Sequence, residues 1–194
     1  MMLHRRAALL LPLVAAACSS TPPRVFAPLR YDYLDPILLD VGQLDINDQW
    51  RPLGANDVGA QSPAPPVPTL VAMARDRLKP AGASGRAVFT ITNASIIRSD
   101  DTLIGNFSIR VDVLDAAGKR QAFAEARVAR TRAGLGSSSE FRGVLYDFVK
   151  AMMDSMNVEM EYQIRRQFGP LLLKAPASVL PAAVQQEALP PGSR

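Results

Sequence analysis

Residues 107–113 alternate strictly between apolar and polar side chains, and this alternation constrains the fold more than any other feature of the chain. The odd-numbered positions hold phenylalanine, isoleucine and valine, and the even-numbered positions hold serine, arginine and aspartate. A period of two is typical of a strand with one buried face. Residues 121–132 alternate as well after the turn residues 115–119. We therefore expect an antiparallel pair of strands whose apolar face is covered by another layer.

The charged positions of this pair predict its register. The two apolar faces align only if opposed residue numbers have an odd sum, which requires a loop of two or four residues. A four-residue loop places Arg110 opposite Glu125, a cross-strand pair of opposite charge. Ala122, Ala124 and Ala126 share the inward face, and such small side chains allow a helix to approach the sheet closely.

Two segments have the 3.6-residue period of amphipathic helices. The longer one carries an apolar stripe that ends before Gly169 and Pro170. Ser137 and Glu140 predict a capping box at its start, in which the Ser137 hydroxyl meets a backbone amide and Glu140 reaches back. The shorter helix is predicted over residues 67–79.

Further strands are expected over residues 37–47, where Gly42 indicates a bulge or a change of face, and over residues 87–97. The resulting order is strand, helix, three strands, helix. This order predicts an α+β fold with two layers, in which a four-stranded, mainly antiparallel sheet carries two helices on one face.

The first eighteen residues have the pattern of an export signal. Arg5 and Arg6 lie in a short basic segment, and residues 7–17 form an apolar run that is too short to span a bilayer. Such a run fits the hydrophobic region of a secretory signal. His4 and Cys18, the one histidine and the one cysteine of the chain, both fall in this segment. An ordinary signal peptide that is cut after an alanine is one interpretation.

The residues around Cys18 favour a second interpretation. Residues 15–18, Ala-Ala-Ala-Cys, resemble the lipobox of bacterial lipoproteins. The resemblance implies that the Cys18 thiol is acylated, that the chain is cut before it, and that the new amine is acylated too. Ser19 stands where an aspartate would resemble an inner-membrane retention signal, so the resemblance implies attachment to the periplasmic face of the outer membrane.

The chain then divides into four parts. The residues after Cys18 are polar and rich in proline, as in a tether, and the far end is rich in alanine and proline without sustained periodicity. We expect a signal peptide, a lipidated tether, a single α+β domain and a disordered tail, over residues 1–17, 18–30, 31–173 and 174–194.

Removal of the signal excludes several classes of chemistry. The mature chain then holds no histidine and no unacylated thiol. Histidine or cysteine metal sites, Cys–His nucleophiles and Ser–His–Asp triads cannot be built from this chain alone. Loss of Arg5 and Arg6 lowers the net charge from +4 to +2, which gives little reason to expect nucleic acid as a partner. We therefore expect no enzyme, no metal and no cofactor.

Four arginines are candidate contacts for anionic groups. Arginine binds carboxylate and phosphate through two parallel hydrogen bonds. An exposed sheet face with these residues would meet phosphate groups of lipopolysaccharide or phospholipid, whereas the alternative is a solvated face balanced by Glu125 and Asp112. The four residues are Arg110, Arg127, Arg130 and Arg132.

Trp50 and a group of methionines are candidate contacts for a partner or a lipid. Trp50 lies in a long loop over residues 48–66, where it packs as a lid on the core rim or stays exposed. The methionines lie in the second half of the long helix, which we expect to extend past the sheet. Methionine is common at adaptable binding surfaces, and ordinary core filling is the alternative. The residues are Met152, Met153, Met156 and Met160.

The order of elements over residues 37–168 supports a second resemblance, one of topology. It is similar to the lipopolysaccharide-assembly lipoprotein that plugs the outer-membrane translocon, and to auxiliary lipoproteins of ABC-type lipid transporters. The resemblance implies a non-enzymatic accessory subunit in envelope assembly or lipid transport, within an envelope protein complex. The alternative is a small-ligand or lipid-binding module with an apolar site under the 48–66 loop and the methionine-rich helix.

Overall fold

The computed structural model describes residues 24–52 and 54–173 of the chain. This part contains two α-helices, two short 3-10 helices and seven strands. In chain order these are β1 (Ile37–Leu39), β2 (Gln43–Asn47), η1 (Gly59–Gln61), α1 (Pro66–Arg77), β3 (Leu78–Pro80), β4 (Arg86–Ser99), β5 (Thr102–Leu114), β6 (Arg120–Ala133), α2 (Phe141–Phe168), η2 (Gly169–Leu171) and β7 (Leu172–Leu173).

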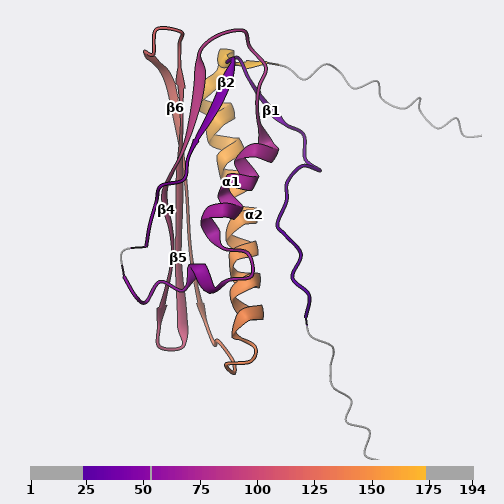
Figure 1. The fold of residues 1–194 in the computed structure, drawn as a ribbon, viewed down its shortest axis with the longest axis vertical. Coiled ribbons are helices and arrows are strands. Elements are labelled where there is room, and N and C mark those ends of the chain that lie inside the picture. The colour runs from indigo at the N-terminus through magenta and orange to yellow at the C-terminus, as the bar shows by residue number, and fades with distance from the viewer. Residues whose placement is uncertain (1–23, 53, 174–194) are drawn as a thin grey trace, which may run out of the picture.

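The main sheet has four strands in the order β2-β4-β5-β6. β4, β5 and β6 pair antiparallel, and β2 pairs parallel to β4. α2 packs mainly against β6 and α1 against β4, and Figure 1 shows both helices on the same side of the three long strands. The predicted α+β class, with a four-stranded and mainly antiparallel sheet, is confirmed.

The register of the β5–β6 hairpin agrees with the charge pairing. Arg110 lies opposite Glu125, and its Nη1 atom lies 3.5 Å from Glu125 Oε1. The connection is Asp115–Lys119, one residue longer than the four-residue loop that was predicted, and an irregularity at the end of β5 absorbs the extra residue. Oδ1 of Asp115 accepts hydrogen bonds from two backbone amides of this turn, at 3.0 and 2.9 Å.

The predicted strand over residues 37–47 is wrong as a single element, because the chain changes sheets near Val41. β1 lies between β3 and β7 in a separate three-stranded sheet, while β2 joins the main sheet. The Val41 amide donates to the Leu39 carbonyl at 2.8 Å, which turns the chain sharply. A Cβ atom at Gly82 would lie 2.6 Å from Val41 N, so only glycine fits beside this turn.

α2 begins at Phe141, four residues after the serine predicted to cap it. Glu140 Oε2 accepts hydrogen bonds from the Ser137 amide at 3.0 Å and from the Ser137 hydroxyl at 2.8 Å. The reach-back half of the capping box is therefore present, but the hydroxyl donates to Glu140 instead of accepting from a helix amide. These bonds, first that from the amide, lower the pKa of Glu140. The helix ends as predicted, at Phe168, before Gly169 with its φ of 36°.

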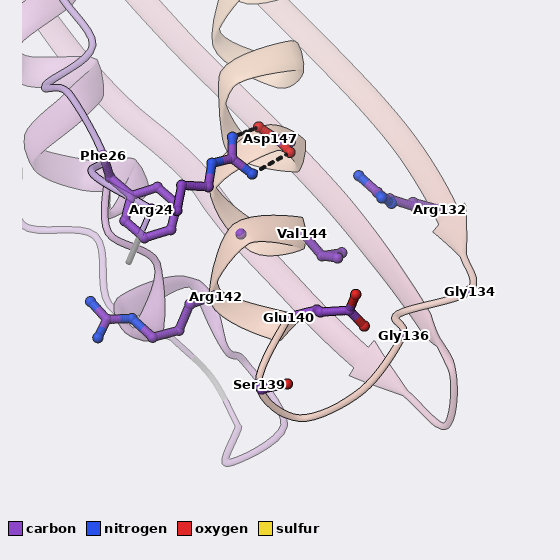
Figure 2. A pocket seen from close by; sticks show the side chains of 11 residues that line it. Arg24, Phe26, Arg132, Gly134, Gly136, Ser139, Glu140, Arg142, Val144 and Asp147 are labelled. Atoms are coloured by element: carbon purple, nitrogen blue, oxygen red, sulfur yellow. Dashed lines mark hydrogen bonds and ion pairs between the residues drawn. The ribbon is translucent and has the colours of Figure 1, made fainter. Parts of the chain in front are cut away.

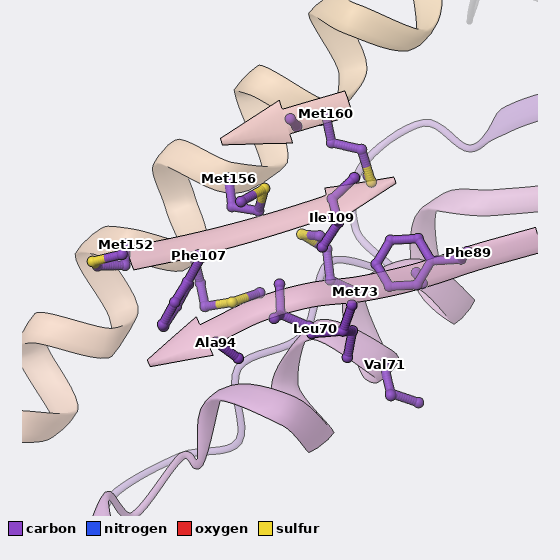
Figure 3. Packing of buried hydrophobic residues seen from close by; sticks show 14 of the residues in the cluster. Leu70, Val71, Met73, Phe89, Ala94, Phe107, Ile109, Met152, Met156 and Met160 are labelled. Carbon is purple, nitrogen blue, oxygen red and sulfur yellow. The ribbon is translucent and has the colours of Figure 1, made fainter. Parts of the chain in front are cut away.

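The four methionines of α2 all lie in the core, with no exposed surface. Figure 3 shows Met152, Met156 and Met160 among the apolar side chains of β5. The expected extension of α2 past the sheet is wrong, because helix and sheet have similar lengths. The 28 residues of α2 span about 42 Å and the 14 residues of β4 span about 46 Å. The residues concerned are Met152, Met153, Met156 and Met160.

Gly105 of β5 leaves the space that α2 needs. A Cβ atom there would lie 2.7 Å from Phe148 Cε1 and would also collide with Met152 Sδ, and both side chains belong to the core. We expect Gly105→Val to lower the free energy of unfolding by about 3 kcal/mol, since overpacking a filled core costs about 1–3 kcal/mol and occasionally more. Urea denaturation measures the change.

Asn106→Val is the matched control for this substitution. Asn106 is the next residue of β5 and is exposed on the opposite face. The change in its unfolding free energy is expected to stay within about 0.5 kcal/mol. Equal losses in the two variants would show that the space at Gly105 is not limiting.

Candidate functional site

Residues 24–31, called the strap below, lie against the two helices. Arg24 donates to both carboxylate oxygens of Asp147 in α2, at 3.0 and 2.5 Å. Its guanidinium also lies 5.6 Å from the centre of the Tyr146 ring. The Tyr146 hydroxyl donates to a strap carbonyl at 2.8 Å. Figure 1 shows the strap, in indigo, running along the outer side of the helices.

The second half of the strap is held by α1. Arg30 donates to both oxygens of Asp76, at 2.8 and 2.7 Å, and the Tyr31 amide donates to the same carboxylate at 2.9 Å. The Tyr31 hydroxyl donates to Asp154 at 3.3 Å. Burial first, and then the neighbouring Asp154 carboxylate, raise the pKa of Tyr31. Both ends of the strap are therefore fixed by charged side chains of the helices.

The strap shortens the predicted tether. Residues 18–30 were expected to be tether, but residues 24–30 contact the domain through Arg24 and Arg30. Only six peptide units separate Cys18 from Arg24. Covalent geometry limits the distance between their Cα atoms to at most about 20 Å. A lipid on Cys18 would thus hold the domain close to a membrane.

The Asp76 carboxylate makes the folded chain sensitive to acid. Its side chain is 6% exposed, and the hydrogen bond from Arg30, followed by that from the Tyr31 amide, lowers its pKa below the usual 3.8. A carboxyl group whose pKa is lower in the folded chain than in the unfolded chain stabilises the fold fully at pH values above its unfolded pKa. This stabilisation is lost as the pH falls through the pKa of the folded chain. We therefore expect the free energy of unfolding to fall below about pH 4.

Asp76→Asn tests this acid sensitivity. The variant is expected to be less stable than the wild type at neutral pH and to show a flatter decline between pH 7 and about pH 3, measured by urea denaturation. Asp48→Asn, in the exposed loop after β2, is expected to keep the wild-type decline. An unchanged decline in Asp76→Asn would assign the acid sensitivity to other groups.

A groove opens at the N-terminal end of α2, beside the first residue of the strap. It has a volume of about 1130 Å³ and is called the basic groove below. Figure 2 shows its charged side chains, which come from the strap, from the end of β6 and from the first turns of α2. They are three arginines, Arg24, Arg132 and Arg142, and two carboxylates, Glu140 and Asp147.

The two carboxylates of the basic groove already have partners. Glu140 accepts the two hydrogen bonds from Ser137, and Asp147 binds Arg24 at 2.5 Å. The hydrogen bond from Arg24 comes first among the causes that lower the pKa of Asp147, and the charge of Arg132 contributes. Among the ion pairs of the described residues, none involves Arg132 or Arg142. These two cations are therefore available to an external anion.

The four arginines singled out in the sequence do not share one face. Arg130 lies opposite Gly105, whose missing Cβ would point at α2, so Arg130 and Arg132 lie on the helix side of β6. Arg110 and Arg127 alternate with these positions and lie on the outer face. The expected common anion-binding face is therefore wrong, because neighbouring residues of a strand point to opposite sides.

The outer pair of arginines is balanced by carboxylates. Arg110 Nε lies 2.8 Å from Asp112 and Arg127 Nη2 lies 2.9 Å from Glu125. The alternative of a solvated, balanced face describes these two residues. The inward Arg132 instead joins Arg24 and Arg142, which the sequence analysis did not single out.

Trp50 lies half-buried between two small hollows. One has a volume of about 200 Å³ and is lined by Pro65 and Pro66, and the other has a volume of about 300 Å³ and is lined by Asn56 and Asn93. Trp50 also packs against the core, as predicted for a lid on the core rim, and its remaining surface faces the hollows.

The apolar site expected under the 48–66 loop and the methionine-rich helix is not formed by these residues. No methionine lines either hollow beside Trp50. Met152, Met153, Met156 and Met160 have no exposed surface with which to contact a lipid or a partner. Core filling, the alternative interpretation, is what the structure shows for them.

Several predictions fall on residues outside the described part of the chain. These are the signal peptide with His4, the lipidation site Cys18 and the tail over residues 174–194. Within the described part, neither helix combines the length and the apolar character needed to cross a bilayer. Nor do three histidine, cysteine, aspartate or glutamate side chains gather there to hold a metal ion.

Comparisons with known proteins give similarities only at the level of structure. No protein-family model matches the chain, and no curated protein matches its sequence. Among solved structures, a minor lipoprotein from Acinetobacter baumannii is similar at 12% identity and a TM-score of 0.27. That match covers 64% of this chain and 96% of the other.

Two further solved structures are similar to a comparable degree. Lipoprotein GNA1162 from Neisseria meningitidis has 12% identity and a TM-score of 0.25, over 62% of this chain and 95% of the other. A PelC variant from Paraburkholderia phytofirmans, described as a dodecamer, has 11% identity and a TM-score of 0.30, over 63% and 92%. Two of the three proteins are named as lipoproteins. TM-scores of this size establish no shared function, so the site is interpreted from its own residues.

Proposed function

We propose that the chain is a lipid-anchored accessory subunit of the bacterial envelope, held by Cys18 on the periplasmic face of the outer membrane. Its domain binds other envelope proteins, in envelope assembly or lipid transport, and catalyses no reaction. The observation that carries the proposal is the outer face of β5 and β6, which neither helix covers. Figure 1 shows both helices on one side of the long strands, and the loop after β2 on the other side, where it borders the outer face of β4 and leaves β5 and β6 uncovered.

The composition of this outer face supports a protein partner. Phe123 and Ile104 are 46% and 39% exposed there, and Arg110 lies 4.5 Å from the centre of the Phe123 ring. Aromatic residues and arginine are enriched at protein interfaces, and polar side chains typically form the rim around the apolar centre of an interface. An exposed phenylalanine that is already ordered by an arginine offers a binding surface at a low entropic cost.

The lipobox and the strap support the membrane anchor. Residues 15–18 carry the lipobox resemblance, and the strap leaves at most about 20 Å between Cys18 and the domain. A subunit held this close to a membrane keeps the outer sheet face within reach of neighbouring envelope proteins.

A photocrosslinking residue in place of Phe123 tests the proposed function in intact cells. Tyr162 of α2 is 55% exposed and gives a matched aromatic control position on the helix side. We expect adducts from position 123 to contain a component of an envelope assembly or lipid transport complex, identified by mass spectrometry, and position 162 to give none. The absence of an envelope adduct at position 123 would contradict the proposal, as would the same adduct from both positions.

A further inference from the structure

We propose that the basic groove docks onto anionic phospholipid headgroups of the membrane that holds Cys18. The inference rests on the lipid anchor of the proposed function and adds an orientation to it. The N-terminal end of α2 faces the membrane, and the sheet stands upright from it. The contact partner is the phosphate layer of the lipid surface.

The cations of the basic groove continue onto the neighbouring strands. The β-sheet register places Arg98 and Arg132 at the same level, with Leu103 of β5 between them. A smaller hollow of about 130 Å³ is lined by Arg98 and Gly136, and Gly136 also lines the basic groove. The hollow bordered by Arg98 and the basic groove bordered by Arg132 and Arg142 thus meet at Gly136. Figure 2 shows Arg132 and Arg142 on opposite sides of the start of α2.

These three arginines have no carboxylate partner in the described part of the chain. The guanidinium of Arg98 instead lies 4.8 Å from the centre of the Phe141 ring, and its Nε donates to the Asp100 carbonyl at 3.4 Å. A planar guanidinium is suited to bind a phosphate through two hydrogen bonds. Headgroup phosphates therefore supply the anionic partners that the described part of the chain does not.

The carboxylates near this surface are mostly engaged. Asp147 and Glu140 have the partners described above, and Asp101 Oδ1 accepts a hydrogen bond from the Leu135 amide at 2.8 Å. Asp100 is exposed in the same β4–β5 turn. The net positive field is therefore modest, and docking depends on short contacts between single arginines and phosphates.

The anchor compensates for a modest affinity. Arg24 lines the basic groove and lies at most about 20 Å from Cys18 along the chain. A second contact on the same membrane is then intramolecular, and a short linker supplies effective concentrations in the millimolar range. Contacts too weak to recruit a free protein are thus sufficient to orient an anchored one.

Hydrogen exchange on anchored protein tests this docking. The full chain is coupled through Cys18, its one cysteine, to maleimide-bearing lipid in vesicles of phosphatidylcholine alone or of phosphatidylcholine with phosphatidylglycerol. The coupling does not depend on natural acylation, so a failure of acylation overturns the proposed function without affecting this experiment. We expect slower exchange of residues 134–144 on the vesicles that contain phosphatidylglycerol, and loss of this protection at high salt.

Two double variants assign the effect to the basic groove. Arg132→Gln with Arg142→Gln is expected to shift the docked equilibrium by roughly 30-fold, from the usual contribution of two arginines at an anionic surface. Arg127→Gln with Arg166→Gln removes the same charge from the outer face of β6 and from the far end of α2, and is expected to keep the protection.

Two results would overturn the proposal. One is equal exchange of residues 134–144 on both vesicle types in the wild-type chain. The other is an equal loss of protection in the two double variants. If the groove variant is not folded by circular dichroism, the lipid and salt comparisons on the wild-type chain decide the question by themselves.

Discussion

The Arg77→Ala variant is expected to lose about 4 kcal/mol of unfolding free energy, the largest stability change predicted for this chain. Arg77 is 2% exposed at the end of α1. Its Nε donates to Asn157 Oδ1 at 2.9 Å, and its terminal nitrogens donate to the Asp35 carbonyl and the Glu161 carboxylate. Alanine would leave the buried Asn157 Oδ1 without its donor, would remove one hydrogen bond each from the Asp35 carbonyl and Glu161, and would leave a cavity.

Urea denaturation measures this loss, with Arg165→Ala as the control. Arg165 pairs with the same Glu161 at 2.7 Å, but its side chain is 58% exposed. An exposed ion pair of this kind contributes about 0–1 kcal/mol. Similar losses in the two variants would show that burial of Arg77 adds nothing to its role.

The expected size of the effect follows from what Arg77 joins. Its partners lie in the segment before β1 and in α2, while Arg77 itself ends α1 directly before β3. One buried guanidinium therefore connects both helices to the chain that leads into the small sheet. A buried charge of this kind is costly to desolvate, and its removal is destabilising because Asn157 stays buried without its donor.

The long elements of the fold were predictable because each has a sustained period. Residues 107–113 of β5 and 121–132 of β6 alternate, which predicted both the strands and the pairing of Arg110 with Glu125. The small sheet could not be predicted in this way. β3 has three residues and β7 has two, too few to show any periodicity.

The position of side chains relative to the ends of elements was harder to predict. A helical period identifies the apolar face of α2, but it does not show how far the sheet extends beneath it. The methionines near the middle of α2, such as Met156, were therefore expected beyond the sheet and lie within the core.

The candidate site was predicted only in part, for a similar reason. Arg132 was named from its strand, but Arg24 lies in a proline-rich stretch that has the composition of a tether. Its partner Asp147 is 123 residues away along the chain. Contacts between residues so far apart have no local signal in a single sequence. The position of Arg142 in the same groove as Arg24 has no such signal either.

Replacement of Cys18 by serine is expected to have the largest effect on the function of the protein. Each buried CH₂ of an acyl chain contributes about 0.8 kcal/mol, and more than one chain is needed for a stable anchor. Without a thiol the chain cannot be acylated at this residue. We expect the ratio of membrane-bound to released protein to fall by at least about 100-fold.

Ser19→Ala is the matched control for the anchor. It changes the adjacent hydroxyl residue and leaves the thiol in place, so the variant is expected to remain in the membrane fraction. Release of both variants would indicate a processing defect around the signal instead of the loss of an acyl chain.

Labelling of growing cells with palmitate, followed by separation of membrane and soluble fractions, tests the lipid anchor most directly. The wild-type chain is predicted to carry the label and to remain with the membranes, and the Cys18→Ser chain is predicted to carry no label and to be released. A wild-type chain without palmitate, or a labelled Cys18→Ser chain, would contradict the assignment of Cys18 as the membrane anchor.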